Sequence, residues 1–84
     1  MAITRLVLDV LKTIRGPTII DLAEKLVELP GVTNVNIKVN EVDVETLTLT
    51  VVIEGSEIDF EEVKKLIEEM GGVIHSVDEV SAKR

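Results

Sequence analysis

The amino-acid sequence predicts an α+β fold in which two helices cover one face of an antiparallel sheet. The main observation is an internal repeat, because sliding the chain by about 41 residues places one strand–helix–strand unit on another. Apolar and turn positions coincide between the copies, as Leu6 does with Leu47 and Gly31 with Gly72. Two βαβ units with right-handed crossovers give a βαββαβ chain whose strands have the spatial order 4-1-3-2. This arrangement is a ferredoxin-like sandwich.

Alternating apolar residues predict the strands. Residues 3–11 and 46–54 alternate with the period of two that half-buried strands show, and residues 32–40 do the same. Beyond them the apolar positions change phase, which predicts a β-bulge near Asn40 and Glu41. The second unit ends in a fourth strand.

Both predicted helices have start and stop signals. The first begins near Thr18, whose hydroxyl can cap free N–H groups with Asp21 three residues on, and it stops at Pro30-Gly31. The second begins at Asp59 and stops at Gly71-Gly72. Each helix has an apolar stripe that we expect to face the sheet, namely Ile19, Leu22, Ala23 and Leu26 in the first and Phe60, Val63, Leu66, Ile67 and Met70 in the second.

Length and composition bound the function. The 84 residues fit a single domain, residues 1–84, and a hydrophobic content of 45% is typical of a globular chain. There is no cysteine, which excludes thiol chemistry and suits a reducing cytoplasm. The net charge of −7 and the single aromatic residue, Phe60, argue against nucleic-acid and membrane partners. No apolar run reaches the length of a signal peptide or membrane span, so we expect a cytoplasmic protein.

The sheet face opposite the helices gives the first functional clue. If Leu6, Leu8 and Val10 face the helices, the intervening residues face away from them. This outward set is Ile3, Arg5, Val7, Asp9 and Leu11, joined by Val52 from the third strand. Contiguous exposed apolar area usually marks an interface, so we expect self-association into a homo-oligomer. The alternative is that β-propensity alone selects valine in these strands.

The single histidine, His75, lies on the fourth strand and is followed by Ser76 and Asp78. Neighbouring residues of a strand point to opposite faces, so we expect Ser76 to be out of reach of His75, which excludes a Ser/His/Asp triad. His75 can pair with Asp9, because the fourth strand lies beside the first. The interpretation that we favour is a structural histidine near the core, turned inward together with Val73 and Val77.

Three carboxylates approach the predicted hairpin turn at alternate positions, Glu41, Asp43 and Glu45. On one strand face they would lie about 7 Å apart, near enough for a hard cation such as calcium or magnesium to draw two of them together. The alternative is a solvated acidic edge that discourages strand-to-strand aggregation.

The segment Arg15-Gly16-Pro17-Thr18 leads from the first strand into the first helix. Free N–H groups at a helix start beside an arginine suggest a pocket for an anion or an amino acid. The same residues also suit an ordinary turn with a helix cap.

The chain resembles a small archaeal family, the domain of unknown function 211, over nearly its whole length. The similar segments are 5–12, Gly31-Val32, 35–37, 41–43, Glu45-Thr46, Glu54-Gly55, 58–62 and 71–80, of which the end His75-Ser76-Val77-Asp78-Glu79-Val80 is the most specific. The resemblance implies a ferredoxin-like fold, an archaeal cytoplasmic setting and a ring-like homo-oligomer. It implies no activity, and it makes site candidates of the residues at its polar motif positions, Asp9, Glu41, Asp43, His75 and Asp78.

Three hypotheses of function follow. The first is a non-enzymatic, self-assembling protein that binds a hard cation through acidic strand residues. The alternative is a small-molecule sensor, similar to the ACT regulatory domains, that binds an amino acid near Arg15 and acts in trans. The third is an enzyme that uses Asp9 and His75 as an acid–base pair, which would require hydrogen-bond reach inside a pocket.

Overall fold

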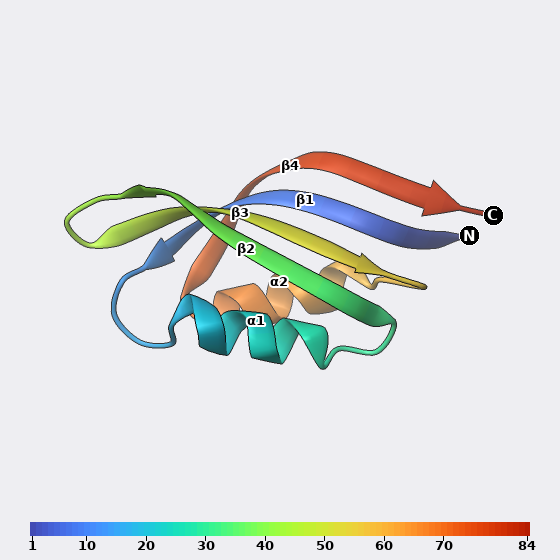
Figure 1. Cartoon of the computed structure of the whole chain (residues 1–84), viewed down its shortest axis with the longest axis horizontal. Coiled ribbons are helices and arrows are strands. Elements are labelled where there is room, and N and C mark those ends of the chain that lie inside the picture. The colour runs from blue at the N-terminus through green and yellow to red at the C-terminus, as the bar shows by residue number, and fades with distance from the viewer.

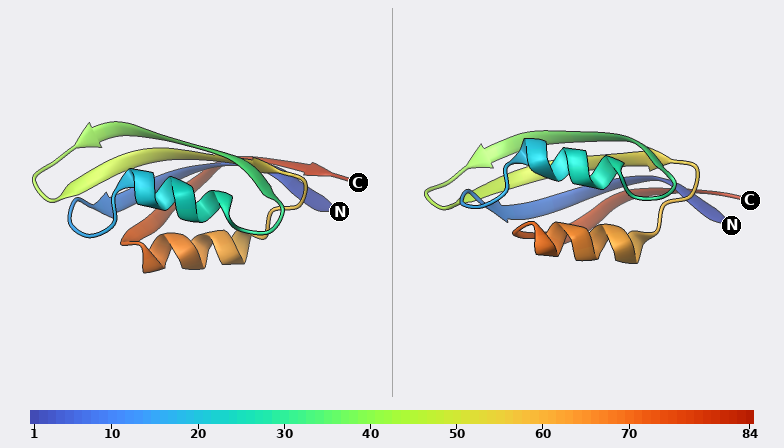
Figure 2. Two further views of the ribbon diagram at one scale, coloured as in Figure 1. Left: turned by 60° about the horizontal axis from the view of Figure 1, so that its bottom comes forward. Right: turned by 90° about the horizontal axis from the view of Figure 1, so that it is seen from below.

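The computed structural model describes residues 1–84 and confirms the predicted ferredoxin-like architecture. Along the chain the elements are β1 (Ala2–Thr13), α1 (Ile19–Val27), β2 (Val32–Val42), β3 (Thr46–Gly55), α2 (Phe60–Glu69) and β4 (Gly72–Lys83). The strands form one antiparallel sheet in the order β2-β3-β1-β4, which is the predicted 4-1-3-2 order read from the other edge. Figures 1 and 2 show both helices against the same face of the sheet.

The helices begin where the capping residues predict. Thr18 and Asp21 form a reciprocal capping box: the Thr18 hydroxyl accepts from the Asp21 backbone N–H at 3.2 Å, and Asp21 Oδ2 accepts from the Thr18 N–H at 2.9 Å. Asp59 caps α2 by accepting from the backbone N–H groups of Glu61 and Glu62 at 3.0 and 3.2 Å. The first orphan donors of each helix are therefore satisfied locally.

The turn from α1 to β2 requires glycine at position 31. Gly31 has φ +81°, a conformation that side-chain-bearing residues adopt at a steric cost. A Cβ atom there would overlap the carbonyl oxygen of Glu57, and the Gly31 carbonyl in turn accepts from the Ser56 N–H at 2.9 Å. The α1–β2 turn thus packs directly on the β3–α2 loop.

The core lies between the sheet and the helices. Its buried members are Leu6, Leu8, Val10, Leu22, Leu26, Leu49, Val51, Ile53, Ile58, Val63 and Ile67. Four further apolar positions of the predicted helix stripes, Ile19, Phe60, Leu66 and Met70, pack against this cluster while partly buried, and Ala23 is partly buried as well. The alternation of β1 and the stripes of both helices are therefore confirmed.

The pairing registers confirm one expectation and correct another. The predicted irregularity of β2 is present, because its register with β3 shifts between Val39 and Glu41. Ile3, expected on the outer face, instead packs against the core. The register of β1 with β4 shifts between Ile3 and Arg5, so the simple alternation fails at this end of the strand.

The edge strand β4 contains two further irregularities. Its register with β1 runs Val7–Glu79, Leu8–Val77, Asp9–Ser76 and Val10–Ile74. His75 and Asp78 are therefore bulged, each without a partner residue on β1. The molecule measures 43 × 22 × 17 Å, and the end of β4 runs beside the start of β1 beyond the helices (Figure 1).

Candidate functional site

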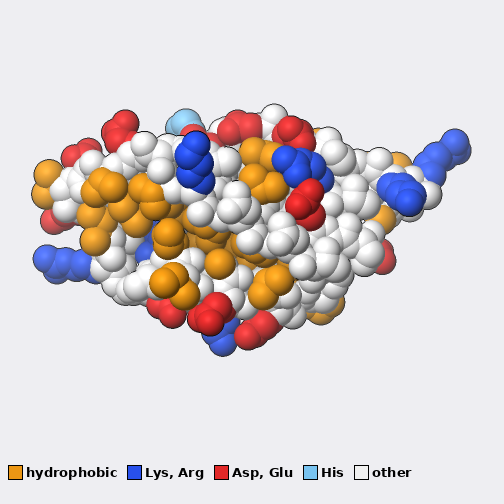
Figure 3. Space-filling model, in the orientation of Figure 1, with side chains coloured by type: hydrophobic (Ala, Val, Ile, Leu, Met, Phe, Trp, Pro, Cys, Tyr) orange, Lys and Arg blue, Asp and Glu red, His pale blue; other side chains and the backbone are white.

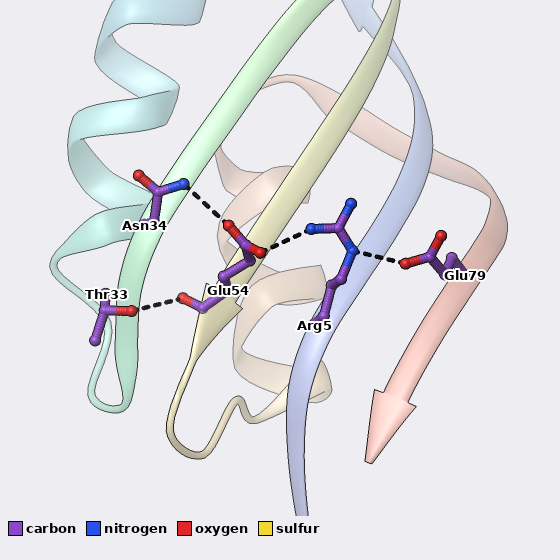
Figure 4. A network of polar contacts seen from close by, with 5 residues as sticks. All are labelled: Arg5, Thr33, Asn34, Glu54 and Glu79. Atoms are coloured by element: carbon purple, nitrogen blue, oxygen red, sulfur yellow. Dashed lines mark hydrogen bonds and ion pairs between the residues drawn. The ribbon is translucent and has the colours of Figure 1, made fainter. Parts of the chain in front are cut away.

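A polar network crosses the outer face of the sheet (Figure 4). Arg5 Nε donates to Glu79 on β4 at 2.6 Å, and Arg5 Nη1 donates to Glu54 on β3 at 2.7 Å. Asn34 of β2 donates to the second oxygen of Glu54 at 3.2 Å. The bonds to Glu79 and Glu54 raise the pKa of the guanidinium above its ordinary value. One row of side chains thus joins all four strands.

The outer face is consequently more polar than expected. Arg5 is doubly paired instead of isolated, and Val7 and Val52, which face each other across β1 and β3, are half-buried. Figure 3 shows charged side chains along the rim of the sheet and apolar atoms along the seam between β2 and α1. The more exposed apolar residues of this face are Leu11 and its partner Val73 at the edge of the sheet.

His75 lies on the outer face, which corrects the prediction of a histidine near the core. Its side chain is 77% exposed, and its Nδ1 lies 3.4 Å from Oδ2 of Asp9. Ile74 is the residue of this segment that packs against the core, whereas Val73 and Val77 are exposed. The phase in which β4 pairs with β1 explains the difference, because Val73 stands opposite the outward Leu11 and Ile74 opposite the core residue Val10. His75, the next residue along the strand, therefore points outward.

The bulge at His75 overturns the expected orientation of Ser76. Ser76 stands opposite Asp9 in the β1–β4 ladder, so the two side chains share the outer face. The hydroxyl of Ser76 donates to Asp78 at 2.8 Å and to no imidazole. Asp9, His75, Ser76 and Asp78 therefore gather along one edge of the sheet, without the serine–histidine bond that a nucleophile requires.

The three acidic residues near the hairpin do not share a strand face. β2 ends at Val42, and Asp43 lies in the turn, where its carboxylate accepts from the Val44 N–H at 2.7 Å. Glu41 follows the bulge and stands opposite Thr48 on β3. No three carboxylate, imidazole or thiolate groups converge in the structure to hold a metal ion. The expected spacing along one strand is therefore wrong.

Arg15 lines a pocket with a volume of about 460 Å³. The pocket lies between the β1–α1 loop and the β2–β3 turn, and its walls are Thr13, Ile14, Arg15, Val44, Glu45 and Thr46. A backbone bond from the Ile14 N–H to the Glu45 carbonyl, 3.0 Å long, joins the two segments. Thr18 and the first turn of α1 do not line this pocket. At that turn the Asp21 carboxylate already accepts a hydrogen bond from the Thr18 N–H. The Thr18 N–H is therefore not free to bind an anion.

Lys12, which is not among the residues predicted from the sequence, is buried with 1% of its surface exposed. Its Nζ donates to the Thr13 carbonyl oxygen at 2.9 Å, and burial lowers the pKa of the ammonium. The alternation that places Leu6, Leu8 and Val10 toward the helices continues to position 12, so this signal was available.

The comparisons with known proteins agree with the resemblance. Residues 4–84 match the family called domain of unknown function 211, described as uncharacterized ArCR. An uncharacterized protein of Methanocaldococcus jannaschii, MJ0319, is 50% identical over 80 residues, which are 95% of this chain and 81% of that protein. Neither helix is long and apolar enough to cross a membrane. The chain therefore belongs to the domain of unknown function 211 family, which has archaeal members and no assigned catalytic function.

Proposed function

We propose that this chain is a non-enzymatic protein that assembles with copies of itself in the cytoplasm. The observation that carries the proposal is the open edge strand β4, which exposes Val73, Val77 and Val80 at 60, 47 and 57%. Val73 pairs with the outward Leu11, whereas Val77 and Val80 pair with the core residues Leu8 and Leu6. β4 therefore presents exposed apolar side chains on both of its faces. Exposed apolar side chains along an unpaired edge strand are typical of an interface between chains.

The opposite edge of the sheet supports the same proposal. β2 is the other outermost strand and is 11 residues long, against 12 for β4. Its outer edge offers unpaired backbone groups. A head-to-tail contact between the two edges would generate a closed ring when the rotation between copies closes, which is the assembly that the family resemblance implies.

The polar contacts favour a role without catalysis. The Ser76 hydroxyl is engaged by Asp78, and His75 is too exposed to shield a reacting group from water. In the proposed assembly Glu41 and Asp43 supply two of the oxygen ligands of a calcium or magnesium ion. A neighbouring copy or water supplies the other oxygen ligands.

Native mass spectrometry without chelator tests copy number and bound ions together. We expect a mass that is a multiple of the 9.2 kDa chain, with calcium adducts on the assembly that the double variant E41Q/D43N loses. The variant Val80→Asp places a charge on the edge and should give a single chain, whereas Ile20→Lys, an exposed apolar position on α1, should leave the assembly intact. A wild-type mass of one chain at micromolar concentration contradicts the assembly, and an assembly without bound ions contradicts the cation.

A further inference from the structure

We propose that the pocket beside Arg15 binds a free α-amino acid with an aliphatic side chain. Two short segments build the pocket, and hydrogen bonds fix both of them. The Thr13 hydroxyl donates to the Arg15 carbonyl at 2.9 Å, which holds the β1–α1 loop. On the other wall, the Asp43 N–H donates to the Thr46 carbonyl at 2.9 Å, closing the turn that carries Val44.

The pocket presents one positive and one negative side chain. Arg15 and Glu45 line it together, yet no ion pair joins them within 4.0 Å. Neither side chain makes a hydrogen bond elsewhere in the chain, although Arg5 on the sheet is engaged twice. An arginine and a carboxylate that face one pocket without meeting match the carboxylate and ammonium groups of a zwitterion.

Part of the pocket wall is apolar. Val44 is 88% exposed at the tip of the turn, and Ile14 is exposed beside it. A ligand with an aliphatic side chain would cover both of these side chains. The opposite charges of Arg15 and Glu45 cancel, which disfavours a phosphate group, and a volume of about 460 Å³ is ample for one amino acid.

Titration of the ¹⁵N-labelled full chain with L-leucine, followed by NMR, tests the site. We expect saturable shifts of the amides of residues 13–16 and 43–46, with a Kd of about 0.1–1 mM because the pocket is open. The variants Arg15→Gln and Glu45→Gln should each weaken leucine binding at least fivefold, while the exposed controls Arg84→Gln and Glu69→Gln should leave it unchanged. A dispersed spectrum of each variant verifies folding.

Two analogues assign the two charges separately. For 4-methylpentanoate, which is leucine without its amino group, Arg15→Gln should weaken binding and Glu45→Gln should not. For 3-methylbutylamine, which lacks the carboxylate, the order should reverse. Absence of saturable shifts up to 20 mM leucine, shifts elsewhere in the chain, or variants that bind like the wild type would overturn the proposal. The leucine site and the proposed self-association are tested independently. A protein that stays a single chain but binds leucine would support the site and contradict the assembly. A protein that assembles but does not bind leucine would contradict the site alone.

Discussion

Lys12 is a charged side chain in an otherwise apolar core, and its burial lowers the stability of the fold. Its aliphatic stem continues the inward row of β1, but the row ends in an ammonium that has one hydrogen-bond acceptor, the Thr13 carbonyl. A buried charge with so few partners is unfavourable for folding, which is why burial lowers its pKa below the ordinary value of 10.5.

We therefore expect Lys12→Met to raise the free energy of unfolding by roughly 1–3 kcal/mol at pH 7. In the wild type the charged form is disfavoured only in the folded state, so stability should increase as the pH rises through the lowered pKa toward 10.5. Lys12→Met should lack this increase. Urea unfolding between pH 7 and pH 10 measures both effects, with Lys83→Met as the exposed control, and a less stable K12M would contradict the argument.

At the scale of elements, the turns decide how the two βαβ halves fit together. Gly16 and Gly31 both have positive φ, +85° and +81°, but only Gly31 lies against another loop. A Cβ at Gly16 meets nothing within 4 Å, whereas at Gly31 it meets the Glu57 backbone. A substitution at Gly16 therefore measures the conformational strain of a positive φ alone, whereas a substitution at Gly31 measures that strain together with a steric overlap.

Gly16→Ala should lower the free energy of unfolding by about 1 kcal/mol, the strain of a left-handed residue alone. Gly31→Ala should lower it by roughly 2–4 kcal/mol, because the β3–α2 loop must also move. Urea unfolding of both variants at one protein concentration gives the comparison. Equal losses would mean that the loop yields without resistance.

The sequence predicted these elements better than it predicted their surfaces. Period-two alternation is imposed by the pleat, so Leu6, Leu8 and Val10 could be assigned to the core without coordinates. The bulges at His75 and Asp78 could not, because neither residue is a glycine and nothing in their neighbours indicates an extra residue. The bulge at His75 changes which face the next side chain occupies, and this misplaced Ser76, whereas His75 was misplaced because Val73 stands opposite the outward Leu11 instead of facing the core. The Arg15 pocket depends on two loops meeting, which no local pattern encodes.

At the scale of the whole molecule, charge opposes association. Each chain carries a net charge of −7, so copies repel one another while apolar edges attract. Salt screens the repulsion, with a Debye length of about 30 Å at 0.01 M and about 10 Å at 0.1 M. The burial of valine side chains is little affected by such changes in sodium chloride.

The dissociation constant of the proposed assembly should therefore fall several-fold between about 0.02 and 0.3 M sodium chloride. Sedimentation equilibrium at both concentrations measures it, and Val80→Asp should remain a single chain throughout. Tighter association at low salt would instead mean that ion pairs hold the copies together.

The two bulges of β4 also determine what kind of strand this edge can accept. Each one interrupts the regular spacing of N–H and C=O groups, so an incoming strand meets an even ladder only over short stretches such as 79–83. A regular extended segment could not continue its backbone hydrogen bonds to β4 past a bulge. A strand with a bulge at the matching position could continue them. The irregular edge therefore favours pairing with a strand whose own irregularities match, and it disfavours the regular strand stacking from which fibrils grow.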